Sequence, residues 1–154
     1  MKIILQIFIV SLFFGCTNVN KIYKNQPLIN LIVDNNKYSI ILKNHFDKNF
    51  KSYGKHLTKI NVKMNLSFNI GSALSNNGSN NLTIVNGRVD FQILNALNTE
   101  KIKSGSISSS INTGSVSSLY GIDENNNFAK ERLSKYLASK LYRKILLHIN
   151  QSEN

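Results

Sequence analysis

The chain has one cysteine, one proline and no tryptophan among its 154 residues. A single cysteine excludes an internal disulfide, so the folded part must be held together by its hydrophobic core. Acidic residues are also scarce, since 8 Asp and Glu stand against 19 Lys and Arg and give a formal net charge of +11. Such a surface attracts phosphate-bearing partners, whether nucleic acid, anionic lipid headgroups or phosphorylated glycolipid. A base-composition bias that favours Asn, Lys and Ile explains part of the same charge.

The sequence also lacks the spacing of a familiar catalytic or metal site. His45, His56 and His148 lie far apart and outside any HExxH motif. The serines between residues 104 and 118 include no GxSxG motif, and Asp90 has no second carboxylate placed for acid–base chemistry. The sequence therefore predicts a protein that is not an enzyme and that has no cofactor and no metal site.

The N-terminus is apolar. Residues 3–14 include only Gln6 and Ser11 as polar positions, and they follow Lys2. A helix of about 12 residues spans about 18 Å, which is well short of the ~30 Å hydrocarbon core of a bilayer. A positive charge, a short apolar run and then a small residue are typical of a secretory signal peptide. We therefore expect cleavage here and not a membrane-spanning helix.

The lone cysteine follows this run directly, in the segment Phe13-Phe14-Gly15-Cys16, which resembles a bacterial lipobox. The resemblance implies a diacylglyceryl group on the Cys16 sulfur, cleavage before Cys16 and acylation of the new amine, which together anchor a protein stably. Residues 1–15 would then be a lipoprotein signal peptide, and residues 16–26 a lipidated tether. Thr17 is not the acidic residue associated with retention in the inner membrane, so we expect the outer membrane. The alternative is an inert, buried thiol.

The pattern of apolar residues predicts a strand, a helix and a second strand in the first half of the folded part. Residues 28–33 form an apolar, β-branched run, which predicts a strand buried on both faces. Between residues 38 and 53 the apolar side chains recur at spacings of three and four, as on one face of a helix, and residues 34–36 offer N-cap oxygens. Residues 60–70 alternate strictly between apolar and polar, as in a long strand with one buried face.

Two more strands and a long helix follow. Residues 82–94 predict a strand whose apolar phase changes, so we expect a bulge near Asn86 and Gly87, and residues 101–113 predict the last strand. The helix has its predicted buried face at Ala129, Leu133, Tyr136, Leu137, Leu141, Ile145 and Ile149.

Together these elements predict an α+β two-layer sandwich, in the order β-α-β-β-β-α. One polar sheet face and two one-sided helices indicate a four-stranded, mostly antiparallel sheet with both helices packed on one face. We assign residues 27–150 to this single domain and residues 151–154 to a tail.

With these elements in this order, the chain resembles the LptE family of lipopolysaccharide-assembly lipoproteins of Gram-negative outer membranes. The resemblance covers nearly the whole chain and rests on the lipobox, the element order and four segments: residues 86–94 (NGRVDFQIL), 101–105 (KIKSG), 117–122 (SSLYGI) and 129–147. Gly121 stands where the family usually has the Ala of a Ser-x-Tyr-Ala loop.

The resemblance implies a lipid-anchored protein on the periplasmic side of the outer membrane. It would sit as a plug in the lumen of its β-barrel partner, LptD, and take part in lipopolysaccharide transport. Polar strand faces suit such a lumen. Lipid A phosphates would meet cations, for which the candidates on or beside the sheet are Lys63, Arg88, Lys101 and Lys103. Tyr120, in the segment that resembles the Ser-x-Tyr-Ala loop, is the candidate contact with the partner.

Two other interpretations stay open. The same fold would serve an auxiliary periplasmic lipoprotein of a lipid-trafficking ABC transporter, whose partner is a transporter and not a barrel. The remote alternative is a basic nucleic-acid-binding module with an uncleaved N-terminus. Because the chain has neither RNP-type aromatics nor a GxxG loop between helices, we expect no nucleic-acid partner.

Overall fold

Four strands and two helices form the domain in a computed structural model, which describes residues 28–50, 59–74, 81–94, 101–114 and 118–150. The elements are β1 (Leu28–Ile32), α2 (Lys37–Asn49), β2 (Lys59–Leu74), β3 (Asn81–Leu94), β4 (Lys101–Thr113) and α3 (Leu119–Asn150). The expected signal peptide, tether and tail, together with Cys16, lie outside the described residues.

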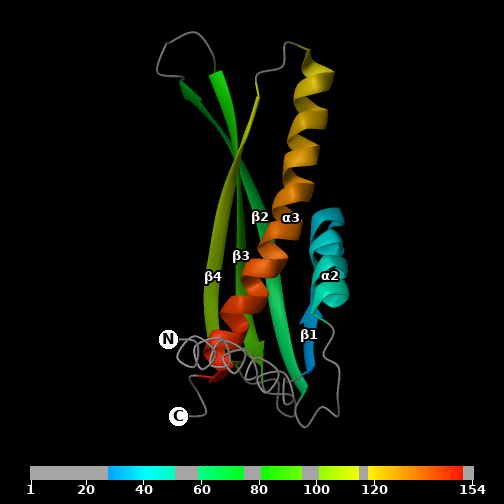
Figure 1. Cartoon of the computed structure of the whole chain (residues 1–154), viewed down its shortest axis with the longest axis vertical. Coiled ribbons are helices and arrows are strands. Elements are labelled where there is room, and N and C mark those ends of the chain that lie inside the picture. The colour runs from blue at the N-terminus through cyan, green and yellow to red at the C-terminus, as the bar shows by residue number, and fades with distance from the viewer. Residues whose placement is uncertain (1–27, 51–58, 75–80, 95–100, 115–117, 151–154) are drawn as a thin grey trace, which may run out of the picture.

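The strands lie in the order β1-β2-β3-β4; β1 runs parallel to β2, and the other neighbours are antiparallel. Figure 1 shows α3 along the length of the sheet and α2 beside its lower half. The Tyr38 hydroxyl at the start of α2 donates to Asn127 Oδ1 at 2.8 Å, and the ring of Phe50 at its end stacks on Tyr142 at 4.0 Å. The two helices therefore run in the same direction. The predicted α+β class, with both helices on one face of the sheet, is confirmed.

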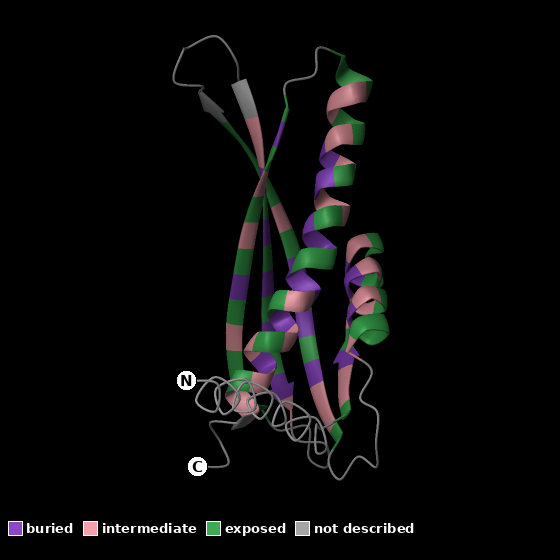
Figure 2. Cartoon of the chain, in the orientation of Figure 1, coloured by how far each residue is buried: buried purple, intermediate pink, exposed green. Residues whose placement is uncertain are grey.

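The core lies between the two helices and one face of the sheet. Figure 2 shows the buried side of each helix turned toward the strands. The main cluster joins apolar side chains of all the described elements; its most central members are Leu42, Phe46, Val62, Val89, Phe91, Leu137, Leu141 and Ile145. A smaller cluster, formed by Val85, Ala129 and Leu133, lies where only α3 covers the sheet.

Two predictions for the strands are wrong in detail. Only Leu31 of β1 is buried, whereas Leu28 and Ile32 are 39% and 43% exposed, because the helices cover one face of the sheet and not both. The expected bulge at Asn86 and Gly87 is also wrong, since β3 pairs with β2 without a break along its whole length. Gly87 itself occupies a buried, helix-facing position in step with Val85 and Val89, and Ile84 lies on the opposite face of the regular strand.

The irregularity in the sheet lies instead at the end of β3. Ile93 pairs with Lys103 and Leu94 pairs with Lys101, so Ile102 is an extra residue in β4. Such a bulge re-aims the side chains on either side of it. Because neighbouring residues of a strand point to opposite faces, Lys103 lies on the helix-facing side with Ile93, and Lys101 lies on the other side with Leu94.

Helix α3 begins earlier than the sequence pattern indicates. It includes Tyr120 in its first turn, where a loop was expected, and the Ser118 hydroxyl oxygen accepts a hydrogen bond from the Gly121 N–H at 3.1 Å. Tyr136 is 57% exposed and not buried as predicted. It lies about 100° around the helix axis from its neighbour Leu137, which is fully buried and faces the sheet. Neither described helix has both the length and the hydropathy to cross a membrane.

Asn36 begins α2, as the sequence indicates. Its side-chain oxygen accepts a hydrogen bond from the backbone N–H of Tyr38 at 2.9 Å. Because Asn36→Ala leaves this first-turn donor without its partner, we expect the free energy of unfolding to fall by about 1 kcal/mol. Asn36→Asp keeps the acceptor and is the matched control, which should be at least as stable as the native chain. Urea unfolding of the three proteins checks this, and an unchanged midpoint for Asn36→Ala would show that the cap contributes nothing.

Candidate functional site

The side of the sheet that faces away from the helices carries no other described element. It presents the polar positions of the strand alternation, and we call this surface the open face. Its central side chains are all exposed and all polar: Lys63, Asn65, Ser67, Asn69, Asn86, Arg88, Asp90, Gln92, Ser104, Ser106, Ser108 and Ser110. The centre of the open face therefore offers hydroxyl, amide and charged groups to a partner, and Leu28 and Ile32 of β1 add partly exposed aliphatic side chains at one edge.

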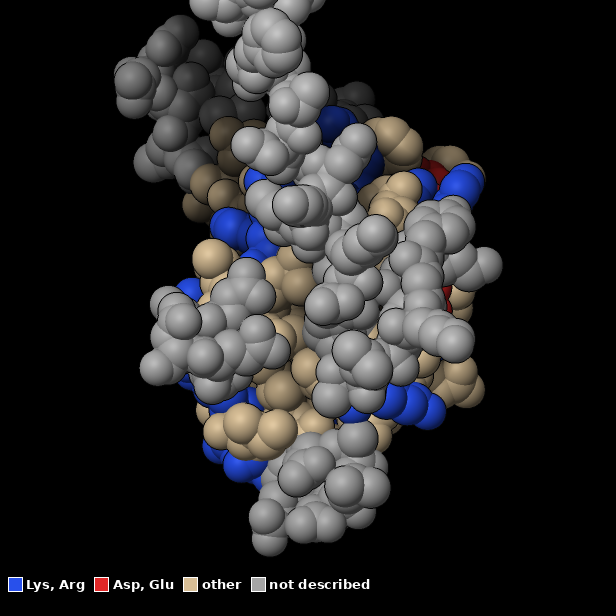
Figure 3. Space-filling view, turned by 60° about the horizontal axis from the view of Figure 1, so that its bottom comes forward, with Lys and Arg blue, Asp and Glu red and all other residues tan. Residues whose placement is uncertain are grey.

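The cations of the open face lie toward its lower end, near the first residues of β2 and β4. In the view of this end, Lys and Arg side chains lie on several sides, and Asp and Glu occupy little of the visible surface (Figure 3). Lys63 belongs to β2 and Lys101 to β4, with β3 between them. Neither lysine has an acidic partner within the described residues.

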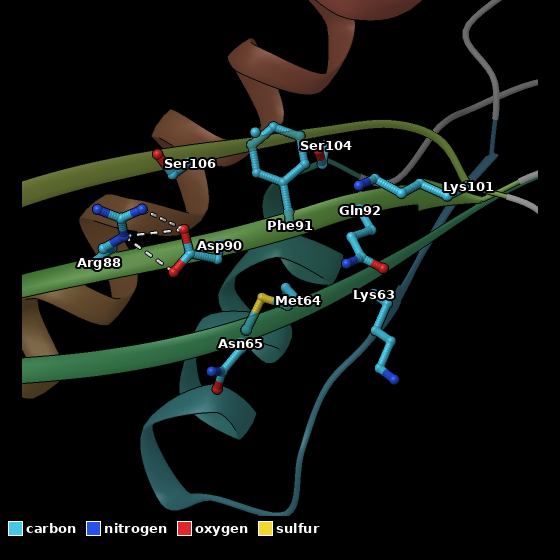
Figure 4. Close-up of a pocket in the computed structure, with 11 residues that line it drawn as sticks. Lys63, Met64, Asn65, Arg88, Asp90, Phe91, Gln92, Lys101, Ser104 and Ser106 are labelled. Carbon is cyan, nitrogen blue, oxygen red and sulfur yellow. Dashed lines mark hydrogen bonds and ion pairs between the residues drawn. The ribbon is translucent and has the colours of Figure 1, made fainter.

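A shallow depression of about 430 Å³ joins these two lysines. Lys63, Gln92 and Ser104 form one row across β2, β3 and β4, and Lys101 and Asn65 lie beside that row. Figure 4 shows Gln92 between the two lysines, with Arg88 and Asp90 further along the sheet. The depression thus places two ammonium groups and several neutral hydrogen-bonding groups around one surface.

Arg88 differs from the lysines because its charge already has a partner. Its Nε lies 3.0 and 3.1 Å from the two carboxylate oxygens of Asp90, and its Nη2 lies 2.9 Å from Oδ1. The hydrogen bond to Asp90, and then the charge of that carboxylate, raise the pKa of Arg88 above its ordinary value. The pair is exposed, so it adds little to stability, but it makes Arg88 a weaker anion ligand than the sequence suggests.

The structure brings together three of the four predicted cations. Lys63, Arg88 and Lys101 line the depression, whereas Lys103 lies on the helix-facing side of the sheet. The bulge at Ile102 causes this separation, because residues two apart in a regular strand share a face. Tyr120 lies at the other end of the domain, where it is 77% exposed, and does not belong to this site.

The arrangement suits the binding of anions and hydroxyl groups. The lysines supply point charges, and the amides and hydroxyls around them can both donate and accept hydrogen bonds. Within the described residues, no three His, Cys, Asp or Glu side chains come together in a way that could hold a metal ion. That the protein is not an enzyme stays a prediction.

Sequence reasoning missed several members of the site. Gln92, Ser104 and Asn65 could not be found from single strands, because the rows across the sheet depend on how the strands are paired. The pairing of Arg88 with Asp90 did leave a signal, since opposite charges two residues apart in a strand lie on the same face.

Solved structures with this fold include small bacterial lipoproteins. A candidate lipoprotein of Caulobacter crescentus is 14% identical with a TM-score of 0.59, and the match covers 80% of this chain and 91% of that one. The minor lipoprotein of Acinetobacter baumannii is 15% identical with a TM-score of 0.56 and coverages of 80% and 90%. Rare lipoprotein B of Shewanella oneidensis is 11% identical with a TM-score of 0.54 and coverages of 82% and 99%. No protein-family model matches the chain, and no curated protein matches its sequence. At these identities the likeness shows that the chain and these proteins share a fold.

Proposed function

We propose that the protein is an outer-membrane lipoprotein that assists lipopolysaccharide transport and assembly as the plug of an LptD-like β-barrel. The observation that carries the proposal is the open face, a sheet surface whose centre is entirely polar, on a fold that small bacterial lipoproteins share.

A polar second face supports the role of a plug because the lumen of a membrane barrel is lined by polar side chains and water. An apolar second face would need a further layer of protein to cover it, as in a sandwich with helices on both sides. The open face needs no such layer, and its serine, asparagine and glutamine side chains can hydrogen-bond to a polar wall. Lys63 and Lys101 add charges that suit a phosphorylated glycolipid.

The lipobox resemblance at residues 13–16 supports anchoring in a membrane. Between Cys16 and the start of β1 at Leu28 the chain can reach at most about 40 Å, which would keep the domain close to its anchor. The intact mass of the protein purified from membranes tests this part. A chain that begins at Cys16 and carries a diacylglyceryl group and an acyl chain supports it, and an unmodified chain that begins at Met1 removes it. Cys16→Ser is the control that abolishes lipidation.

Co-purification of the native chain from its own membranes tests the partner. We expect an outer-membrane β-barrel in an amount similar to that of the chain. Recovery of an ABC transporter would favour the auxiliary-lipoprotein interpretation and contradict the plug. Steeply salt-dependent binding to RNA or DNA, by a chain that keeps its N-terminus, would replace the proposal with the nucleic-acid module.

Direct binding of lipid A depends on the two unpaired lysines of the open face. The double variant Lys63→Gln and Lys101→Gln is expected to bind detergent-solubilised lipid A about tenfold or more weakly, because each substitution removes a charge-assisted hydrogen bond to the lipid. Lys103→Gln is the control for the single variant Lys101→Gln, since it removes one charge two residues from Lys101 but on the other side of the sheet. Isothermal titration of the variants checks the prediction. Equal affinities for all of them would rule out direct binding at the open face.

A further inference from the structure

One end of the domain gathers the ends of several elements. Leu28, the first residue of β1, pairs with Lys59, the first residue of β2. Leu94 at the end of β3 pairs with Lys101 at the start of β4. The C-terminal turns of α3 reach the same end (Figure 1), where the ring centroids of His148 and Phe91 are 6.1 Å apart. We call this the tether end, because the N-terminal segment enters the described fold here.

The tether end holds most of the net charge of the described residues. Six basic side chains and no acidic one belong to the segments at this end, which are residues 28–32, 59–64, 91–94, 101–105 and 141–150. The rest of the described chain contains eight basic and six acidic side chains. The six are Lys59, Lys63, Lys101, Lys103, Arg143 and Lys144. On the adjacent helix α2, Asp47 is paired with Lys43 at 3.1 Å, so it does not offset them; Glu100 lies outside the described residues.

Exposed aliphatic side chains lie among these cations. Ile102 in the bulge of β4 is 62% exposed, Leu147 of α3 is 59% exposed and Leu28 is 39% exposed. A groove of about 390 Å³ between β4 and α3 combines Leu147 with Lys140, Arg143 and Lys144. Cations beside exposed apolar groups match the two layers of a bilayer interface, in which phosphates lie above the acyl chains.

We propose that the tether end rests on an anionic glycerophospholipid surface. Leu147 and Ile102 would reach the acyl boundary, and the surrounding cations would bind headgroup phosphates. A second copy of this chain is a poor occupant, because it would bring six cations against six. Figure 3 looks toward this end of the molecule and shows Lys and Arg on more than one side of it. Lys63 and Lys101 also belong to the open face, but the cations replaced in the test below lie outside its depression and the proposal needs no barrel partner, so it can fail or hold independently of the proposed function.

Charge-matched variants of the full-length, unlipidated Cys16→Ser chain test the role of the cations. The tether-end variant replaces Lys59, Lys103, Arg143 and Lys144 with Gln and keeps both lysines of the open-face depression. The control variant replaces Lys37, Lys130, Arg132 and Lys135 with Gln, which removes the same charge far from this end. Binding is measured by flotation with vesicles of phosphatidylcholine, with and without phosphatidylglycerol.

On vesicles that contain phosphatidylglycerol, the tether-end variant is expected to lose at least tenfold in binding, since each cation near an anionic surface contributes about fivefold. The control variant should lose less than about threefold, through long-range attraction alone. Equal losses for the two variants would overturn the proposal, because net charge and not position would then govern binding. Unchanged binding of the tether-end variant would overturn it as well.

A fluorescence experiment tests which end touches the lipid. Because the chain has no tryptophan, Ile102→Trp places a single reporter at the tether end, and Tyr136→Trp places one on the outer side of α3. With phosphatidylglycerol vesicles we expect a blue shift and quenching by brominated acyl chains for Ile102→Trp and neither for Tyr136→Trp. The same shift on pure phosphatidylcholine would overturn the proposal, because the apolar N-terminus alone would then explain the contact. Failure of a barrel to co-purify would leave these results unaffected.

Discussion

Phe91→Ala is expected to lower the free energy of unfolding by about 3–5 kcal/mol. The ring is 1% exposed and lies in the central strand β3, within the main core cluster. It also covers Gly105 on the neighbouring strand, where a Cβ would lie 2.8 Å from Phe91 Cζ. Removing the ring therefore leaves a cavity that the backbone of β4 cannot fill.

Gly105→Ala provides the test of this contact because its effect should depend on the ring. In the native background the added methyl group meets a buried aromatic ring that cannot move aside, which costs about 1–3 kcal/mol. In the Phe91→Ala background the same methyl enters vacated space and relieves the entropic cost of glycine in a strand, so it should be neutral or stabilising. Urea unfolding of the two single variants and the double variant measures the coupling. Additive effects would contradict the packing of Phe91 on Gly105.

Leu137→Ala is expected to destabilise the domain by about 2–5 kcal/mol. The side chain is fully buried in the main cluster, and α3 uses it to reach the sheet at Gly87. A Cβ on Gly87 would lie 2.9 Å from Leu137 Cδ1 and 3.2 Å from Phe68 Cε1. The helix therefore approaches β3 closely at the one helix-facing position of that strand that has no side chain.

The contact between Leu137 and Gly87 can be separated from simple loss of buried area by a double-mutant cycle. Gly87→Ala alone should destabilise the domain, although by less than Gly105→Ala, because the end of a leucine side chain can shift where a phenyl ring cannot. With Leu137→Ala also present, the cost of Gly87→Ala should disappear. Thermal unfolding followed by circular dichroism gives the four values. If Gly87→Ala still lowers the free energy of unfolding when Leu137 is replaced, the loss arises in the backbone of β3 and not in this contact.

The fold could be predicted because its signals are local. The alternation of Val62, Met64 and Leu66 in β2 and the spacing of Leu133, Leu137 and Leu141 in α3 are visible in contiguous residues. The prediction of a bulge at Gly87 is wrong because glycine has no apolar side chain, so the sequence does not reveal that this position faces the core. Leu137 of α3, which comes fifty residues later in the chain, fills the space where a side chain at Gly87 would lie.

The candidate site was less accessible to prediction than the fold. Lys101 and Lys103 would share a face in a regular strand, and only the pairing with Ile93 and Leu94 reveals the bulge that separates them. The start of α3 was missed for a different reason. Gly121 disfavours a helix by about 1 kcal/mol relative to Ala, and the segment that contains Tyr120 resembles a loop. The Ser118 hydroxyl oxygen nevertheless accepts a hydrogen bond from the Gly121 N–H, and the helix continues through both residues.

Strand β4 forms one edge of the described sheet, where a second copy of the protein could pair with it. No described strand lies outside β4, and a long, serine-rich strand at an edge is a template for pairing with another chain. Lys140 Nζ donates to the backbone oxygen of Ser108 at 2.8 Å, in the middle of this strand. A second chain that paired there would have to break this bond and bury an ammonium group against its own backbone. Aggregation through a continuous sheet is therefore opposed at the site where the fold would otherwise be most open to it.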